Sequence, residues 1–375
     1  MKFMVERDTF ADAVGWVARA LPTRPPSPVL SGVRVKATTD EGGKVTLASF
    51  DYEVSAKVEI GADVEEGGEI LVSGRLLAEI AKLLPAKPVI LQLDGSKAVV
   101  TCGSSTFTLL TMTIDDYPTL PALPAAAGGV EAGQFATAVG QVAIAATRDE
   151  TLPLLTGVRM EIEGQNLTFL ATDRYRLAIK ELTWKPTSPD ISRVALVRAK
   201  TLTEVARSFG HTEEVEVSLT APGIADIIGF AAGGRETTSL LIDGEYPQVR
   251  KLLPDSFDVS AVLEVQPLIE AVRRVSLVAE RNTPVQIAFA DGEAVLNAGA
   301  GDDAQASEVL QADVTGPINV AFNPHYLLEG LSVMAAPSVR LNMNSSTKPV
   351  LFQGENDGQV ASDYRYLLVP IRFTV

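Results

Sequence analysis

The sequence is poor in the residues that build disulfides and metal clusters. Its 375 residues include one cysteine, Cys102, and two histidines, His211 and His325. A single cysteine forms no disulfide within the chain, and Cys/His metal sites need several such ligands close together. These absences exclude a disulfide-stapled secreted domain and a zinc-finger type of protein, and they fit a reducing cytoplasm.

Long apolar runs and targeting signals are also lacking. The apolar runs are short, VALV (Val194–Val197) being typical, whereas a membrane-spanning helix needs about 18 apolar residues in a row. Near the N-terminus, Glu6, Arg7 and Asp8 stand where a secretory signal needs its apolar stretch. Neither end carries a lipidation signal. We therefore expect a cytoplasmic protein that makes no membrane contact.

Positive charge is scarce. Lys and Arg total 32 against 47 Asp and Glu, so the net charge is -15. The 46% of hydrophobic and 21% of charged residues are typical of a folded protein, and the length suggests two or three domains. The negative total argues against a basic groove for nucleic acid, because long-range attraction needs a positive field. A total does not show how the charges are distributed.

What the sequence does contain is a threefold repeat. Apolar residues spaced four, three, four indicate one face of a helix near the start of each part. They are Phe10, Val14, Val17 and Leu21, then Phe135, Val139, Val142 and Ala146, then Leu268, Val272, Val275 and Ala279. Linker-like breaks lie at Pro118–Gly129 and Leu252–Ser260. We predict three domains, at residues 1–122, 130–253 and 259–375.

Each repeat is predicted to be mostly β-structure with two amphipathic helices. Extended segments follow the first helices at Pro28–Val35, Pro153–Met160 and Pro284–Phe289, and second strands at Lys44–Val54, Asn166–Ile179 and Glu293–Gly299. The second helices are expected to open at Gly74, Ala199 and Asn323. The fold class is therefore α+β with three repeated domains. Closed rings of such units are favoured over open arrays, and two chains would supply six units.

Catalytic motifs are lacking. The sequence has no G-x-x-x-x-G-K-[ST] loop, no Rossmann glycine fingerprint, no H-E-x-x-H and no G-x-S-x-G. The acid pairs Asp115/Asp116 and Asp302/Asp303 stand in turn-like segments, where solvated acids are common. The position of His325 at a helix start favours capping over base catalysis, and Cys102 is expected to be a small apolar strand residue. No catalytic residue, metal or cofactor is predicted.

Positive charge is enriched in the predicted helices. The six helix windows are residues 8–20, 74–87, 134–148, 198–211, 266–281 and 323–334. They hold 11 Lys/Arg and 7 Asp/Glu, a net of +4, and the rest of the chain holds 21 and 40, a net of -19. If the helices share one surface, that surface is mildly basic on an acidic body. Random scatter of the charges is the alternative.

Several runs of residues together resemble one known family. The three repeats, ATDRYRLA (Ala171–Ala178), the GEYP corner (Gly244–Pro247) and the terminal YRYLLVPIRF (Tyr364–Phe373) resemble the β subunit of bacterial DNA polymerase III, the sliding clamp. The resemblance covers the whole chain. It implies a non-catalytic processivity subunit for DNA replication, a head-to-tail homodimer whose six-domain ring encircles duplex DNA, with helices lining the hole.

The resemblance also implies a cleft between the second and third domains. In the family, a short peptide motif docks there from the replicative polymerase alpha subunit, the clamp loader delta subunit, other polymerases, ligase and mismatch-repair proteins. The matching positions are Leu155, Thr172, Arg176, Leu177, Pro247, Lys251, Leu252, Asn323, Tyr326, Leu367, Val369, Pro370, Ile371 and Arg372. Where the family often has Gly-His, this chain has Arg174 and Tyr175.

DNA contacts and a dimer edge follow from the same resemblance. Arg24 and Arg75 match duplex-facing positions of the family, and Arg148 lies nearby in the second repeat. The helix charge count adds Lys200 and Arg207. Contacts of this kind go to phosphates, so they are independent of base sequence and weaken with salt. The dimer edge is expected at Phe107 and Leu109, against Leu277 and Val278 of the other copy.

Two other classes of function stay open at this point. A non-catalytic β-rich scaffold would bind peptides but no DNA, and its helix faces would be neutral. A hydrolase would use one of the two acid pairs. A clamp differs from both, because it stays on circular DNA in high salt and leaves the DNA when the circle is cut.

Overall fold

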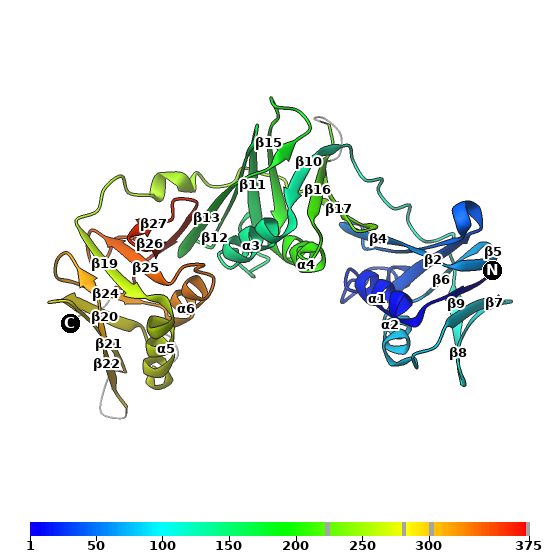
Figure 1. Ribbon diagram of the computed structural model, residues 1–375, viewed down its shortest axis with the longest axis horizontal. Helices are drawn as coiled ribbons and strands as arrows, with labels where there is room; N and C mark the ends of the chain where they lie inside the picture. The colour runs from blue at the N-terminus through cyan, green and yellow to red at the C-terminus, as the bar shows by residue number, and fades with distance from the viewer. Residues whose placement is uncertain (222–225, 280–282, 300–303, 373–375) are drawn as a thin grey trace. The chain divides into compact units, whose positions relative to one another are not determined.

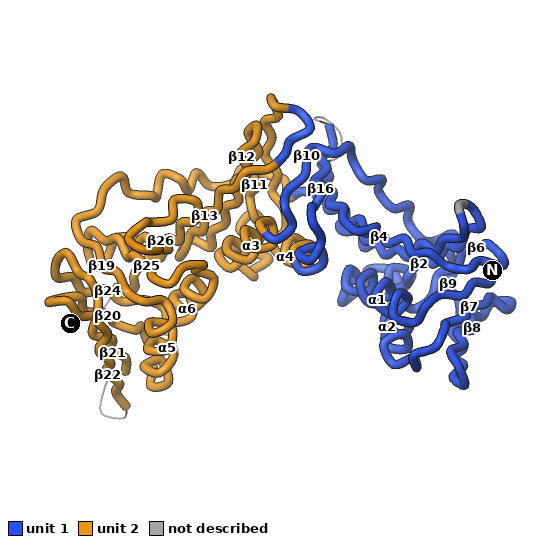
Figure 2. Tube along the Cα trace, in the orientation of Figure 1, with its two compact units in different colours: residues 1–133, 185–188, 207–241 blue, residues 134–184, 189–206, 242–375 orange. Residues whose placement is uncertain are grey.

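The computed structural model of the chain describes residues 1–221, 226–279, 283–299 and 304–372. These residues fold as two units (Figure 2). Unit 1 comprises residues 1–133, 185–188 and 207–241, and unit 2 comprises residues 134–184, 189–206 and 242–375. In the part of the chain that is described, no helix is both long enough and apolar enough to cross a membrane.

Unit 1 is built on a continuous 14-stranded sheet (Figure 1). Its strands are β1 Lys2–Val5, β2 Gly32–Thr38, β3 Lys44–Phe50, β4 Val54–Gly61, β5 Asp63–Glu66, β6 Gly68–Ser73, β7 Val89–Asp94, β8 Lys97–Cys102, β9 Ser105–Met112, β10 Ala126–Glu131, β14 Lys185–Pro186, β16 Glu214–Leu219, β17 Ile227–Ala232 and β18 Arg235–Leu240. Their order is β14-β10-β16-β17-β18-β4-β3-β2-β6-β9-β8-β7-β1-β5. The predicted linker therefore ends within a strand, because β10 begins at Ala126.

Unit 2 holds two sheets. Their strands are β11 Gly157–Glu163, β12 Asn166–Thr172, β13 Arg176–Thr183, β15 Ser192–Arg198, β19 Val259–Glu264, β20 Val285–Ala290, β21 Glu293–Ala298, β22 Ala306–Gln311, β23 Asp313–Val314, β24 Ile318–Phe322, β25 Ser338–Met343, β26 Val350–Asn356, β27 Gln359–Val360 and β28 Tyr364–Leu368. The larger sheet has the order β15-β11-β12-β13-β28-β26-β25-β19-β23, with β27 paired to β26. The smaller sheet has the order β22-β21-β20-β24.

The two large sheets repeat one strand order. Nine strands of unit 1, β14-β10-β16-β17-β18-β4-β3-β2-β6, correspond one by one to β23-β19-β25-β26-β28-β13-β12-β11-β15 of unit 2. In the middle of each run, strands from successive repeats pair antiparallel, β4 with β18 and β13 with β28. We call these pairings the first seam and the second seam. The predicted repeat is confirmed in the strand order itself.

Six α-helices lie in the described residues: α1 Arg7–Ala18, α2 Gly74–Leu83, α3 Ala132–Ala143, α4 Ala199–Phe209, α5 Val265–Val275 and α6 Pro324–Ser332. In unit 1, α1 packs on α2 and on β3 and β4, and in unit 2, α5 packs on α6 (Figure 1). The predicted apolar faces are confirmed, since residues such as Phe10, Phe135 and Leu268 are buried. The second helices begin where expected, α6 after its N-cap Asn323.

Two segments predicted to be extended begin instead with a 3-10 turn. These turns are η1 (Pro28–Ser31) and η3 (Pro153–Thr156), and the strands β2 and β11 start only after them. Proline holds φ near the helical value. The hydroxyls of Ser31 and Thr156 donate to the carbonyls of Pro28 and Pro153 at 2.6 and 2.7 Å, which closes each turn.

The predicted second strands of the first two repeats are in fact hairpins. β3 and β4 are separated by residues 51–53, and β12 and β13 by residues 173–175. The Oδ1 atoms of Asp51 and Asp173 accept hydrogen bonds from the amides two and three residues further on. The next residues, Tyr52 and Arg174, have φ values of 75° and 81°, in the left-handed region. These Asx turns reverse the chain, which strand composition alone did not indicate.

Candidate functional site

The apolar residues predicted for the cleft gather around the second seam in unit 2. Leu155, Leu177 and Leu367 belong to one hydrophobic cluster with Tyr246 and Val249. Leu177 and Leu367 are opposite each other across the seam, and each is 2% exposed. Burying apolar side chains of this size stabilises the fold by about 2 kcal/mol each. These leucines therefore form a packed apolar layer, which we call the floor of the predicted cleft. They do not belong to its accessible edge.

Other predicted cleft residues are accessible. Exposed members are Pro247, Lys251, Leu252, Val369 and Arg372, whereas Pro370 is buried and Ile371 is half-buried. The backbone of the C-terminal segment is held at two points. The amide of Val369 donates to the carbonyl of Tyr175 at 2.9 Å, and the amide of Ile371 donates to the carbonyl of Ala321 at 2.8 Å. The segment therefore presents Val369 beside the turn between β12 and β13.

Arg176 lies at the start of β13 and joins that strand to α6. Its Nε donates to Asp173 Oδ2 at 2.9 Å and its Nη1 donates to Glu329 Oε2 at 2.5 Å. Burial works against the charged form, but interactions with Tyr366, Glu329 and Asp173 outweigh it and raise the pKa of Arg176. A buried guanidinium is stable only when paired in this way. Arg176 is therefore a buried cation that is paired with two carboxylates of the same chain.

The rings of Tyr326 and Tyr175, which we call the aromatic wall, are stacked beside the guanidinium of Arg176. The Tyr326 ring has the Arg176 guanidinium 4.3 Å from its centroid, and the Tyr175 ring stacks on it at 6.1 Å. The hydroxyl of Tyr366 donates to the carbonyl of Tyr326 at 2.8 Å, which fixes the backbone of α6 there. Tyr175 is 53% exposed. It therefore offers an accessible aromatic face held by its neighbours.

Thr172 and Asn323 stabilise local structure. The hydroxyl of Thr172 donates to the carbonyl of Arg176 at 2.6 Å, and its amide donates to the hydroxyl of Tyr246 at 2.9 Å. Burial raises the pKa of Tyr246 to about 12, so this hydroxyl stays protonated at neutral pH. Asn323 Oδ1 accepts from the amide of His325 at 2.9 Å. The capping role expected around His325 is confirmed.

The partners of Arg176 were not predicted. Asp173 stands three residues before it in ATDRYRLA, a spacing that could have indicated a local ion pair. Glu329 lies 153 residues further along the chain, and no spacing rule connects the two. The hydroxyls of Tyr246 and Tyr366 were missed for the same reason. The pairing of strands at the second seam brings Glu329 and Tyr366 to Arg176, and folding within the second repeat brings Tyr246 to Thr172.

The predicted DNA contacts are all exposed side chains. Arg24, Arg75 and Arg207 lie in unit 1, and Arg148 and Lys200 in unit 2. Arg75 Nη2 donates to the carbonyl of Pro22 at 3.0 Å, so its side chain reaches the loop that carries Arg24. Within unit 1 the structure thus brings Arg24 and Arg75 near each other. Their role stays a prediction.

The residues predicted for the dimer edge differ in accessibility. Leu277 is 85% and Phe107 is 38% exposed, and Val278 is half-buried. Leu109 is only 3% exposed and pairs with the buried Ala98 of β8, so its side chain belongs to the core of unit 1. The next residue, Leu110, is 70% exposed. Side chains alternate along a strand, and the sequence pattern did not show which set faces the core.

Two strands at these places have an open edge. β9 pairs with β8 along its length, but with β6 only at Thr111 and Met112. β22 lies at the end of its sheet, and β21 is its one strand neighbour among the described residues. Open edges present unpaired backbone groups that another strand can bind. Each unit therefore has an edge available for pairing.

The sequence candidates for catalysis gain no support. Asp115 and Asp116 are exposed, and Asp302/Asp303 lies outside the described residues. Within residues 1–221, 226–279, 283–299 and 304–372, no three His, Cys, Asp or Glu side chains are grouped to hold a metal. Cys102 is buried, and its Sγ donates to the carbonyls of Pro85 and Lys87. The structural role expected for Cys102 is confirmed.

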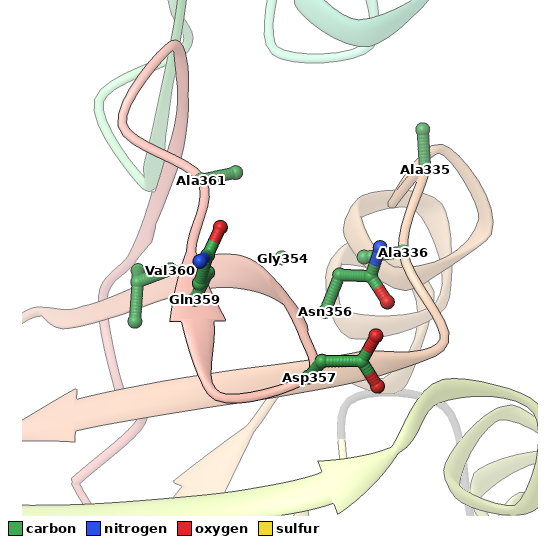
Figure 3. A pocket seen from close by; sticks show the side chains of 8 residues that line it. All are labelled: Ala335, Ala336, Gly354, Asn356, Asp357, Gln359, Val360 and Ala361. Carbon is green, nitrogen blue, oxygen red and sulfur yellow. The ribbon is translucent and has the colours of Figure 1, made fainter.

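A separate hollow of about 340 Å³ lies beside the β26–β27 hairpin (Figure 3). Its lining consists of Ala335, Ala336, Gly354, Asn356, Asp357, Gln359, Val360 and Ala361. Asn356 and Asp357 extend on the side of Ala336, and Gln359 lies by Val360 and Ala361 (Figure 3). None of the predicted site residues lines it.

Comparison with known proteins gives matches along the chain. Three family models match it: DNA polymerase III beta subunit, N-terminal domain at residues 1–121, central domain at 129–248, and C-terminal domain at 250–372. The chain is 50% identical to the beta sliding clamp of Streptomyces coelicolor over 378 aligned positions, covering 100% of both proteins. It is 56% identical to that of Micrococcus luteus over 308 positions, covering 82% of this chain and 98% of the relative.

A solved structure agrees. The sliding clamp of Bacillus subtilis superposes with a TM-score of 0.92 at 25% identity, covering 100% of both chains. The seam arrangement thus recurs in a protein with a quarter of its residues in common. The chain belongs to the DNA polymerase III beta subunit family.

Proposed function

We propose that this protein is a DNA sliding clamp, a non-catalytic processivity subunit that encircles duplex DNA and keeps the replicative polymerase on its template. Membership of the family supports this role. The single observation that carries the ring geometry is the repetition of the seam. Two seams are formed inside the chain, and the corresponding strands at the remaining position, β9 and β22, have open edges.

A third seam between two copies follows from the strand correspondence. β9 corresponds to β18 and β28, because each is the last strand of the antiparallel run that follows the second helix of its repeat. In the same way, β22 corresponds to β4 and β13. Pairing β9 of one copy with β22 of the next is head-to-tail. Two copies close a ring of six repeats, the domains being residues 1–122, 130–253 and 259–375.

The register of that third seam follows from the other two. Lys57 pairs with Glu236 at the first seam, and Ile179 pairs with Arg365 at the second. When the paired strands of the three repeats are aligned, Ser307 on β22 corresponds to Lys57 on β4. Likewise, Thr106 on β9 corresponds to Glu236 on β18. Ser307 of one copy therefore lies opposite Thr106 of the other.

A cysteine pair tests this register. Directly paired residues of antiparallel strands have Cα atoms about 4.5–5.5 Å apart, within the range of a disulfide. The double variant Thr106→Cys/Ser307→Cys should form a covalently closed dimer on mild oxidation. Thr106→Cys/Gln311→Cys, with the second cysteine four residues away, is the matched control and should stay uncrosslinked. Equal crosslinking of both variants contradicts the register.

Binding by enclosure is consistent with the net charge of -15. A closed ring needs little attraction to its DNA, and exposed cations such as Arg24 and Arg75 supply weak, screened phosphate contacts. The protein should remain on closed circular DNA in high salt and leave it after linearisation. Equal release from circular and linear DNA would exclude the clamp. Solution mass should be near twice 39.8 kDa, and a stable monomer argues against the ring.

The cleft at the second seam is the proposed docking site for partners. The polymerase alpha subunit, the clamp loader delta subunit, other polymerases, ligase and mismatch-repair proteins would each insert a short peptide there. The packed leucine floor, the exposed Leu252 and Val369, and the Tyr175 ring support this assignment. Small apolar sites with a few polar groups suit short peptides. As a replication subunit, the protein would act in the cytoplasm.

A further inference from the structure

The short helix η4 (Val249–Leu252) joins the second and third repeats in unit 2 and carries two exposed cleft residues, Lys251 and Leu252. Val249 anchors it in the hydrophobic cluster. Leu253, directly after η4, packs against the same cluster. Apolar contacts therefore hold both ends of η4, and Arg250, Lys251 and Leu252 lie between them.

Arg250 adds a polar attachment to these apolar contacts. Its Nη2 lies 2.5 Å from Glu161 Oε2 on β11, and its Nη1 lies 3.9 Å from Glu181 Oε1 on β13. Glu161 is itself held by Arg159 Nε at 2.8 Å, and Glu181 is paired with Arg365 on β28. The Arg250 guanidinium thus connects η4 to β11 and β13, two strands of the sheet that contains the second seam.

The space around this ion pair is unsuited to a ligand. A hollow of about 280 Å³ is lined by Glu161, Glu163, Asn166, Thr168 and Arg250. The two carboxylates disfavour an anion, and the guanidinium disfavours a cation. The hollow does admit water to the pair, and Arg250 is 45% exposed. The strength of the pair should therefore depend on salt.

At the first seam, the described positions that match Arg250 and Glu161 hold other kinds of residue. Arg250 lies four residues after Tyr246. Tyr117 corresponds to Tyr246 in the first repeat, and the residue four positions after Tyr117 is Pro121. On β2, Lys36 takes the place of Glu161. Proline and lysine cannot form this ion pair. Among the residues that the structure describes, this attachment is thus found beside the second seam, where the exposed cleft residues lie, and not at the matching positions beside the first.

We propose that Arg250 is a positioning residue for the partner-docking cleft. Through Glu161 and Glu181 it fixes η4, so that Lys251 and Leu252 meet an incoming peptide in one arrangement. The peptide does not have to order them on binding, which would cost affinity. The inference rests on the proposed clamp function and concerns the same cleft.

The test is peptide affinity in the full-length protein. The probe is a labelled peptide spanning the clamp-contacting segment of the polymerase alpha subunit of the same genome. Arg250→Ala should weaken its binding roughly fivefold, the effect of one partly exposed charged contact. Glu161→Gln should weaken it similarly. Because both variants remove the Arg250–Glu161 pair, their losses should not add, and the double variant should bind about as weakly as Arg250→Ala.

Lys180→Ala is the matched control. It breaks the Lys180–Asp363 ion pair on the same sheet, which does not involve η4, and should leave affinity unchanged. Wild-type affinity should also fall with salt more steeply than that of Arg250→Ala. If Arg250→Ala and Glu161→Gln bind as wild type does, the positioning role is wrong. If the wild type binds no such peptide, the proposed docking function fails instead. If Arg250→Ala does not fold, the peptide affinity of Glu161→Gln alone tests the positioning role.

Discussion

The two seams share a strand order but differ in the residues that meet across them. At the second seam, Leu177 faces Leu367 in the hydrophobic cluster. At the corresponding place of the first seam, Ser55 faces Thr238, and their hydroxyls are 2.6 Å apart and buried. The first seam is therefore closed by a polar pair and the second by an apolar floor. The same backbone pairing therefore carries different chemistry at the two seams.

The turns beside the seams show the same contrast. Tyr117 and Tyr246 occupy matching places, and burial raises the pKa of each to about 12. Next to Tyr246 stands Thr172, whereas the first seam has Phe50, 6% exposed and in edge contact with Tyr52. Both side chains are buried, Thr172 at 4% and Phe50 at 6% exposure, but the threonine is small and polar and the phenylalanine is a large apolar ring. Matching positions of the repeated strand order thus hold side chains of different size and polarity at the two seams.

The largest expected effect comes from breaking the floor of the second seam. Leu177→Ala should lower the free energy of unfolding of unit 2 by about 3 kcal/mol, because a cavity is left in a packed cluster. Trp184 lies in unit 2 and Trp16 in unit 1, and both are buried. Urea unfolding of Trp16→Phe and Trp184→Phe backgrounds would separate the two units. An equal shift of the unfolding transitions reported by Trp16 and Trp184 would contradict an effect confined to unit 2.

A smaller effect is expected on binding at the aromatic wall. Tyr175→Ala should weaken partner-peptide binding roughly tenfold, since an exposed, ordered aromatic ring is a typical anchor for a peptide. Tyr52→Ala removes a ring of similar exposure at the first seam, 51% against 53%, and is the control. Isothermal titration calorimetry measures both. A loss of binding in the Tyr52 variant would show that the first seam also docks peptides.

The polar pair of the first seam gives the next prediction. Ser55→Ala should lower the free energy of unfolding of unit 1 by about 1–2 kcal/mol, because it leaves the buried Thr238 hydroxyl without its partner. Ser55→Ala/Thr238→Val removes both hydroxyls and should recover most of that loss. Trp16 fluorescence during urea unfolding measures the free energy of unfolding of unit 1 in each variant. Additive losses in the double variant would mean that the two hydroxyls act separately.

The smallest effect concerns the open edge at β22. The Arg274 guanidinium beside Glu308 lowers the pKa of that carboxyl. A lowered folded pKa means that the ion pair stabilises the protein above the ordinary Glu value of about 4.3, and that this contribution disappears as pH falls through the lowered value. In an NMR titration, Arg274→Met should return the pKa of Glu308 to the ordinary value. An unchanged pKa would exclude Arg274 as its cause.

Much of the fold was predictable from local pattern. The four-three-four spacing identified the first helices, and the second helices began at Gly74, Ala199 and after Asn323 as expected. The hairpin turns at Asp51 and Asp173 were missed, because an Asx turn can lie inside an apparently continuous strand pattern. The burial of Leu109 was missed because alternation does not say which face meets the core.

The sequence by itself determined the threefold repeat, the helix faces, the single structural cysteine and the family, since these depend on residues close together or on runs shared with relatives. Only the tertiary structure decided that Arg176 meets Glu329 and that Arg250 meets Glu161. The partners in each pair come from distant segments, 153 and 89 residues apart. The Arg176–Glu329 pair forms only when β13 joins β28 and brings two repeats into one sheet, and the Arg250–Glu161 pair forms when η4 folds back onto β11.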